Sequence, residues 1–186
     1  MSVLALDVSG TPRAWVTPKE AICYFAKNQV VWSLGDIVAG FRGGYRNDGS
    51  RSYIESPSII AVKGNGFDLA RHGRVALSNN TLFGRDRNVC AYCGDHFPNN
   101  RHLSREHIVP RSKGGLDTWM NVVTACISCN TKKGNKTLKE AKMELLYVPY
   151  KPNHYEHLLL QGRNISIDQM EYLMSGVPKH SRLLAA

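Results

Sequence analysis

The chain has 186 residues, 42% of them hydrophobic and 21% charged, so it can bury a core and is not of the disordered class. Its formal net charge of +9 favours polyanionic partners such as nucleic acids. No apolar run approaches the roughly 18 residues that span a membrane, and the N-terminus lacks signal-peptide features, so we expect a cytoplasmic, intracellular protein with no membrane partner.

The N-terminal half is predicted to contain short strands and one capped helix. Thr17 is suited to cap a helix that starts at Pro18, because Glu20 follows three residues after the cap, and the helix should run to about Lys27. Strands are predicted at residues 3–7, 30–32, 58–62 and 74–77. Residues 40–52 are rich in Gly, Arg, Asn, Asp and Ser and are predicted to form a loop.

The second half is predicted to alternate short strands with helices. Strands are expected at residues 103–109 and 121–125, with a basic, flexible loop at 111–115 between them. Helices are expected from Ser78 as cap to about Asp86, from near Cys126 through Asn130, at 138–146 with Pro149 and Pro152 as stops, and at 166–175 with Ser166 as cap.

Four of the five cysteines form two Cys-x-x-Cys pairs, namely Cys90 with Cys93 and Cys126 with Cys129. An odd cysteine count in a long chain without an export signal does not suit a disulfide scaffold, whereas two such pairs suit a tetrahedral structural Zn²⁺. Cys23 lies among apolar residues of the first helix and is expected to be a buried small hydrophobe.

Histidines outside the central segment are expected at the surface. His96 and His102 lie near the first cysteine pair, but four cysteines already complete a tetrahedron. The remaining histidines without a companion motif are His72, His154, His157 and His180.

The segment between the cysteine pairs carries residues suited to phosphodiester hydrolysis. Glu106 and His107 are adjacent, and His is a natural general base near neutral pH. Asn130 follows a zinc ligand, so the zinc site would hold its helix and place its oxygen opposite Glu106. A carboxylate and an amide oxygen together suit Mg²⁺ or Mn²⁺.

Residues 88–137 resemble the HNH endonuclease family, part of the ββα-metal or His-Me-finger superfamily. The matching residues are Cys90, Cys93 and Gly94, the run Glu106–Gly115, Asn121, and Cys126, Cys129, Asn130, Lys133 and Gly134. A weaker resemblance joins residues 18–35 and 57–60 to the leader of free-standing bacterial and phage HNH proteins.

The resemblance implies that His107 activates water, that Glu106 and Asn130 bind the catalytic ion, and that Asn121 orients the His107 loop through hydrogen bonds. The sequence departs from the family pattern at Glu106, where Asp is common, and at Asn130, which replaces a His and favours Mg²⁺-type chemistry. Basic residues flank this segment and are expected to contact the DNA backbone; they are Arg105, Arg111, Lys113, Lys132, Lys133 and Lys136.

The expected fold class is α+β, with a ββα-metal core stabilised by a four-cysteine zinc site. The expected domains are an N-terminal α+β extension at 1–80, the nuclease at 81–137 and a helical C-terminal extension at 138–186. The expected function is metal-dependent DNA cleavage, for which a homodimer would explain double-strand cutting. Three alternatives stay open: a non-catalytic zinc-stabilised nucleic-acid-binding module, an RNA-directed nuclease and a zinc-dependent protein-interaction domain.

Overall fold

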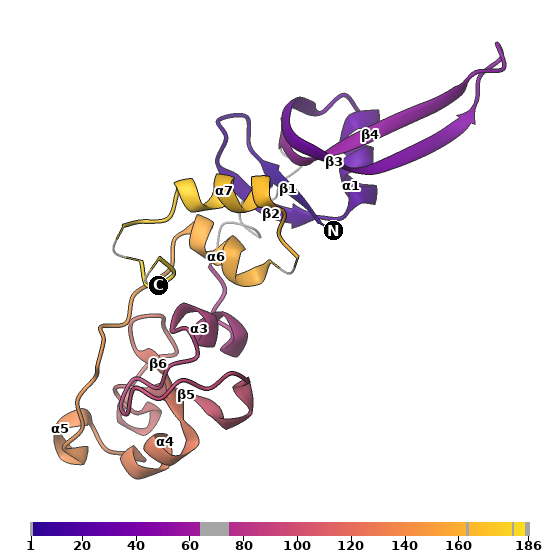
Figure 1. The fold of residues 1–186 in the computed structure, drawn as a ribbon. Coiled ribbons are helices and arrows are strands. Elements are labelled where there is room, and N and C mark those ends of the chain that lie inside the picture. Colours follow the sequence, from indigo (N-terminus) through magenta and orange to yellow (C-terminus); the bar gives the residue numbers. More distant parts are fainter. Residues whose placement is uncertain (1, 64–74, 163, 180, 185–186) are drawn as a thin grey trace. The chain divides into compact units, whose positions relative to one another are not determined.

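Two sheets, one of four strands and one of two, organise the chain in the computed structural model, which describes residues 2–63, 75–162, 164–179 and 181–184. The chain packs as two units: Met1–Arg74 with His154–Val177, and Val75–Asn153 with Pro178–Ala186 (Figure 1). The architecture is mixed α/β, as the sequence predicts. No helix in the described ranges has the length and apolarity needed to cross a bilayer.

The first unit is built on the four-stranded sheet, in the order β2-β1-β4-β3. Its strands are β1 (Val3–Leu6), β2 (Pro12–Val16), β3 (Val30–Tyr45) and β4 (Arg51–Val62), and its helices are α1 (Pro18–Ala26), α6 (His154–Gln161) and α7 (Ile167–Ser175). β1 is antiparallel to β2 and parallel to β4, and β3 is antiparallel to β4.

Side-chain alternation along β1 divides the core of this unit between two faces of the sheet. Val3 and Ala5 pack in a cluster that contains Ala21 of α1. Leu4 and Leu6 pack in a second cluster with Leu158 of α6 and Leu173 of α7. The sheet is therefore covered by α1 on one face and by α6 and α7 on the other.

The predicted caps of α1 and α7 are confirmed. The Thr17 hydroxyl accepts a hydrogen bond from the Glu20 backbone, and Glu20 accepts one from the Thr17 backbone at 2.7 Å. Ser166 is the N-cap of α7, and its backbone amide donates to Oε1 of Gln169 at 3.1 Å. Cys23, however, is exposed, so its predicted burial is wrong: the helix turns Ala21, Tyr24 and Phe25 toward the sheet instead.

The predicted loop at 40–52 is wrong, because β3 and β4 continue as a paired hairpin through most of it. The turn is confined to residues 46–50, where the Arg46 amide donates to Ser50 at 2.7 Å and Gly49 has a φ of +79°. Turn-forming side chains did not exclude a ladder here, since ladder hydrogen bonds join backbone groups.

Other boundaries also differ from the prediction. Residues 75–77 form no strand, and Arg74 of that predicted strand lies outside the described residues. The helix predicted at 138–146 ends at Ala141, because Lys142 adopts a left-handed conformation with a φ of +52°. The strand β2 and the helix α6 were not predicted. His157 is buried, contrary to its expected place at the surface; His72 and His180 lie outside the described residues.

The second unit contains the two-stranded sheet and several short helices. Its elements are α3 (Asn79–Arg85), β5 (Leu103–His107), β6 (Val122–Cys126), α4 (Ile127–Lys133) and α5 (Leu138–Ala141), with 3-10 turns at Asn100–His102 and Arg111–Lys113. β5 and β6 are antiparallel, and α4 follows β6 directly, which makes the predicted ββα element. Ser78 caps α3, as expected.

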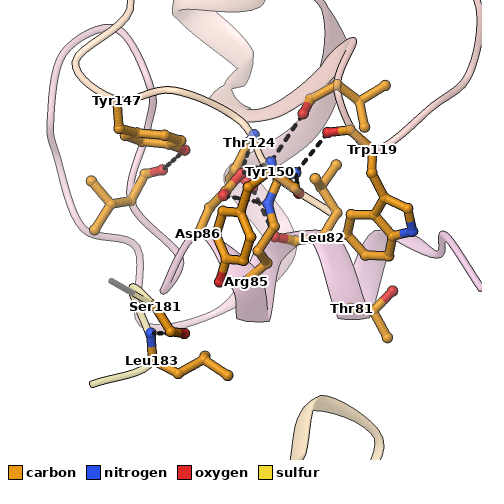
Figure 2. A network of polar contacts seen from close by, with 12 residues as sticks. Thr81, Leu82, Arg85, Asp86, Trp119, Thr124, Tyr147, Tyr150, Ser181 and Leu183 are labelled. Carbon is orange, nitrogen blue, oxygen red and sulfur yellow. Dashed lines mark hydrogen bonds and ion pairs between the residues drawn. The ribbon is translucent and has the colours of Figure 1, made fainter. Parts of the chain in front are cut away.

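Arg85 at the end of α3 is fully buried and uses all five of its N–H donors (Figure 2). Nε and Nη2 donate to Asp86, at 2.8 and 3.0 Å. Nη1 and Nη2 also donate at 2.9 Å to the carbonyl oxygens of Trp119, Tyr150 and Val122. Asp86 in turn accepts from the amide of Thr124 at 2.8 Å, so the pair fixes α3 to β6.

The three domains expected at 1–80, 81–137 and 138–186 stay a prediction about how function is divided. In the packing of the described residues, α6 and α7 belong to the unit of the four-stranded sheet. α5 and residues 178–179 and 181–184 belong to the unit of the ββα element.

Candidate active site and metal centre

The four cysteines of the two Cys-x-x-Cys pairs converge on one point. Their sulfur atoms all lie within 4.8 Å of one another, and Sγ of Cys93 lies 4.0 Å from Sγ of Cys126. Thiolates around a tetrahedral Zn²⁺, with bonds of about 2.3 Å, are separated by roughly 3.8 Å. The cluster therefore fits a single ion of that size, and the amide of Cys129 donates to Sγ of Cys126 at 3.4 Å.

The electrostatics of this cluster favour a bound cation. Burial, together with neighbouring thiol groups, raises the pKa of Cys129 to about 11 and also raises the pKa of Cys93. Burial is the largest cause of both shifts, whereas backbone hydrogen bonds outweigh burial at Cys90 and lower its pKa. A bound divalent cation would offset the cost of burying thiolates, because metal coordination favours the thiolate form.

Glu106, His107 and Asn130 line one pocket of about 260 Å³ in the ββα element. Glu106 and His107 are the last two residues of β5, and Asn130 lies in α4. Successive residues of a regular strand point to opposite faces, and both residues line this pocket at the point where the strand ends. The structure thus brings together the three residues expected to carry the chemistry.

Glu106 is 5% exposed and forms an ion pair with the fully buried ammonium of Lys133. Lys133 also donates to the carbonyl oxygen of His107 at 2.7 Å. Burial raises the pKa of Glu106, while the hydrogen bond and charge of Lys133 act in the lowering direction. The expectation that Lys133 contacts DNA is therefore wrong: its position in α4 turns it inward, where it neutralises Glu106.

His107 has a side-chain partner that the sequence reasoning missed. Its Nε2 lies 3.0 Å from Oδ1 of Asp117, and the other carboxylate oxygen of Asp117 accepts from Arg105. Burial acts to raise the pKa of Asp117, but hydrogen bonds and charges from Arg105 and His107 outweigh it and lower that pKa. Asp117 lies ten residues after His107, in a loop with no regular spacing, so no motif signals the contact.

Asn121 closes the loop that follows His107. Its Oδ1 accepts from the Val109 amide at 2.9 Å, and its Nδ2 donates to the carbonyl oxygens of Val109 and Leu116 at 3.1 and 2.9 Å. Gly115 lies against the same turn, where an added Cβ would collide with the carbonyl oxygen of Val109. The side chain of Asn121 therefore holds the loop and lies outside the pocket lining.

Asn130 is held by its amide nitrogen, which donates to Oγ of Ser104 at 2.8 Å. Ser104 is fixed in turn, because its hydroxyl donates to the Ala125 carbonyl oxygen across the sheet at 3.1 Å. This arrangement leaves the carbonyl oxygen of Asn130 as the atom suited to a hard cation. Glu106, with one oxygen taken by Lys133, keeps its second oxygen for the same purpose.

The basic residues around the pocket differ in their exposure and in whether a carboxylate already pairs with them. Lys132 and Lys136 are exposed, and Arg111 is exposed at the pocket rim. Arg105 is paired with Asp117, and Lys113 is paired with Glu140. Of the six residues expected to touch DNA, these pairings leave Arg111, Lys132 and Lys136 as the cations without a carboxylate partner among the described residues.

Part of this unit is similar to known proteins. Residues 90–146 match the HNH endonuclease family. A stretch of 69 residues is 30% identical to the Type IV methyl-directed restriction enzyme EcoKMcrA of Escherichia coli (strain K12). That stretch covers 34% of this chain and 25% of the relative, so the chain matches about a quarter of the relative's length.

Proposed function

Because residues 90–146 match the HNH endonuclease family and four cysteines converge within that stretch, we propose that this protein is a metal-dependent endonuclease that hydrolyses DNA phosphodiester bonds. The observation that carries the proposal is the convergence of Glu106, His107 and Asn130 on one pocket beside the four-cysteine cluster. A base and two oxygen ligands in one small polar space are what metal-assisted hydrolysis of a phosphodiester requires.

His107 is the proposed general base. Asp117 accepts the Nε2–H hydrogen bond, which favours the tautomer whose Nδ1 carries a lone pair. Nδ1 takes a proton from a water molecule as the water oxygen attacks phosphorus. The new bond forms in line with the departing 3′ oxygen, whose bond to phosphorus breaks. Asp117 keeps the imidazole in place and stabilises its protonated form.

Glu106 and Asn130 are the proposed ligands of a divalent ion, Mg²⁺ or Mn²⁺, through the oxygens that Lys133 and Ser104 leave unoccupied. When bound, such an ion supplies a Lewis acid that offsets charge on the phosphate and on the leaving oxygen. Asn121 keeps the His107 loop closed. The four cysteines hold a structural Zn²⁺ that fixes α4, and with it Asn130.

DNA is the proposed partner. Arg111, Lys132 and Lys136 are the proposed contacts to phosphates around the pocket, without reading bases. Lys113 can join them when Glu140 is displaced, whereas Arg105 stays paired with Asp117, the residue that positions His107. The full activity of the restriction enzyme named above belongs to that protein; similarity over a quarter of its length supports a nuclease here and leaves the target open.

The deciding experiment is a plasmid nicking assay with Mg²⁺ or Mn²⁺. We expect wild type to convert supercoiled DNA to open circles and His107→Ala to lose at least about 100-fold in rate, the usual contribution of a general base. His96→Ala, an exposed histidine outside the pocket, is the matched control. A His107→Ala protein that cuts as fast as the control would overturn the mechanism.

A non-catalytic zinc-stabilised nucleic-acid-binding module is the second candidate. The ion pair between Glu106 and Lys133 favours it, because an internal cation already satisfies one oxygen of the proposed metal ligand. This candidate expects salt-sensitive DNA binding with no cleavage in any divalent ion. Matched DNA and RNA substrates in the same assay distinguish an RNA-directed nuclease.

A further inference from the structure

The β3–β4 hairpin has an outer part that the rest of the sheet does not use. β1 pairs with β4 only at residues 59–61, so beyond Ile37 and Pro57 the two strands pair with each other alone among the described residues. Figure 1 shows this ribbon projecting past β1 and α1 of its own unit. A two-stranded ribbon without a covered face is marginally stable in water, so its length favours a partner.

The exposed end of this ribbon, residues 40–53, is cationic and polar. It contains Arg42, Arg46 and Arg51 against a single carboxylate, Asp48, for a net charge of +2. None of the three arginines has a carboxylate partner among the described residues. Tyr45 is 77% exposed. The surface therefore offers guanidinium groups without carboxylate partners among the described residues, together with hydrogen-bonding side chains.

The ribbon end is also slender and is held by contacts of its own. Arg51 lies over the Tyr45 ring, 5.5 Å from its centroid, and donates to the carbonyl oxygen of Gly43 at 2.9 Å. Gly44 and Gly49 have open space where a Cβ would stand, so the backbone itself can approach a ligand closely. Two strands lie about 4.8 Å apart, and six residues extend about 20 Å, which suits a B-DNA major groove about 12 Å wide.

We propose that the ribbon end at residues 40–53 inserts into the major groove of double-stranded DNA and acts as a binding element separate from the HNH pocket. This inference rests on the proposed DNA endonuclease function. Arg42 and Arg46 contact the phosphates that border the groove, and the turn at residues 46–50 reaches the base edges. The ribbon contributes affinity for the substrate and takes no part in the hydrolysis.

The test is fluorescence anisotropy of His107→Ala protein on a DNA duplex across a salt series. Adding Arg42→Gln with Arg46→Gln should weaken binding about tenfold and lower the slope of log affinity against log salt by about 2. Lys19→Gln with Lys27→Gln removes the same charge from exposed positions at α1 and should leave both quantities nearly unchanged. Arg42→Lys with Arg46→Lys should restore the slope.

Duplex RNA of the same sequence separates groove insertion from general attraction. Its major groove is deep and narrow and does not admit a ribbon, so the glutamine variant should bind RNA as the parent does. Equal losses in the ribbon and α1 variants, equal losses on DNA and RNA, or no loss at all would each overturn the proposal.

Cleavage is measured separately from binding. In the wild-type background, the glutamine pair should raise the DNA concentration needed for half-saturation of cleavage. Ribbon-dependent binding without any cleavage would refute the endonuclease function and spare this inference. Cleavage with the same half-saturating DNA concentration in wild type and in the glutamine variant would refute this inference and support the endonuclease function.

Discussion

Lys133 reaches from α4 into the interior of the ββα element and forms an ion pair with Glu106, the carboxylate proposed to hold the catalytic ion. Its ammonium also donates to the carbonyl oxygen of His107, the next residue along β5. One buried cation therefore positions both the carboxylate and the backbone of the proposed base. Removing it affects stability and the site together.

Lys133→Met should lower the free energy of unfolding by about 3–5 kcal/mol, because it leaves the buried Glu106 carboxylate without its counter-ion. Lys132→Met, at the exposed neighbouring position, should change it by less than about 0.5 kcal/mol. Urea unfolding measures both, and adding Glu106→Gln to Lys133→Met should recover part of the loss. Equal stability of the two lysine variants would show that the ion pair contributes nothing.

Cys129→Ser should abolish metal binding by the four-cysteine cluster. Elemental analysis of purified wild type should find about one Zn²⁺ per chain, the content of a four-thiolate site. Cys23→Ser should retain it, since Cys23 is exposed on α1 and lies outside the cluster. Hydrogen exchange in Cys129→Ser should accelerate in residues 75–153 more than in β1, and zinc retained by that variant would contradict the assignment.

Arg85→Lys should destabilise the unit of the ββα element by about 3–5 kcal/mol despite keeping the charge. A lysine has three donors and no planar fork, so it cannot serve Asp86 and three carbonyl oxygens at once. Arg87→Lys, two residues on and exposed, is the control. Thermal unfolding compares them, and indistinguishable midpoints would mean that the network in Figure 2 is dispensable.

The ionisation of Asp7 makes the free energy of unfolding depend on pH. Burial acts against ionisation, but hydrogen bonds from Ser9, Thr11 and Arg13 outweigh it and lower the pKa of Asp7 from 3.8 to about 2. A carboxyl with a lowered folded-state pKa contributes stability that is complete above its unfolded pKa and disappears as pH falls through about 2. At its partly exposed position, this amounts to about 1–2 kcal/mol.

Asp7→Asn should therefore be less stable than wild type at pH 6, and the difference should shrink between pH 4 and about 2. Glu55→Gln, an exposed carboxylate on β4, serves as control. Urea unfolding at each pH provides the measurement. A difference between Asp7→Asn and wild type that stays constant across this range would exclude the linkage.

Lys132→Ala with Lys136→Ala should weaken DNA binding and lower the salt slope by about 2, because both side chains are exposed cations near the pocket. Lys113→Ala should have a smaller effect, since Glu140 already neutralises that ammonium. Anisotropy with His107→Ala protein tests this. A larger effect from Lys113→Ala than from the double variant would reverse the assignment of the phosphate contacts.

Local signals in the sequence were sufficient for several elements. The caps at Thr17, Ser78 and Ser166 were predictable, because a hydroxyl and the first turn of its helix lie within three residues of one another. The two Cys-x-x-Cys pairs were equally predictable as one cluster, since thiolates at that spacing suit a single ion. Glu106, His107 and Asn130 followed from the motif that joins these pairs.

Tertiary structure alone decided the rest, because the decisive partners are distant in sequence or lack a fixed spacing. The inward direction of Lys133 depends on how α4 packs against β5, and the contact of Asp117 with His107 depends on a loop. The ribbon forms because two strands satisfy each other's backbone groups whatever their side chains. Which helices cover the four-stranded sheet was likewise settled by burial, which no local pattern encodes.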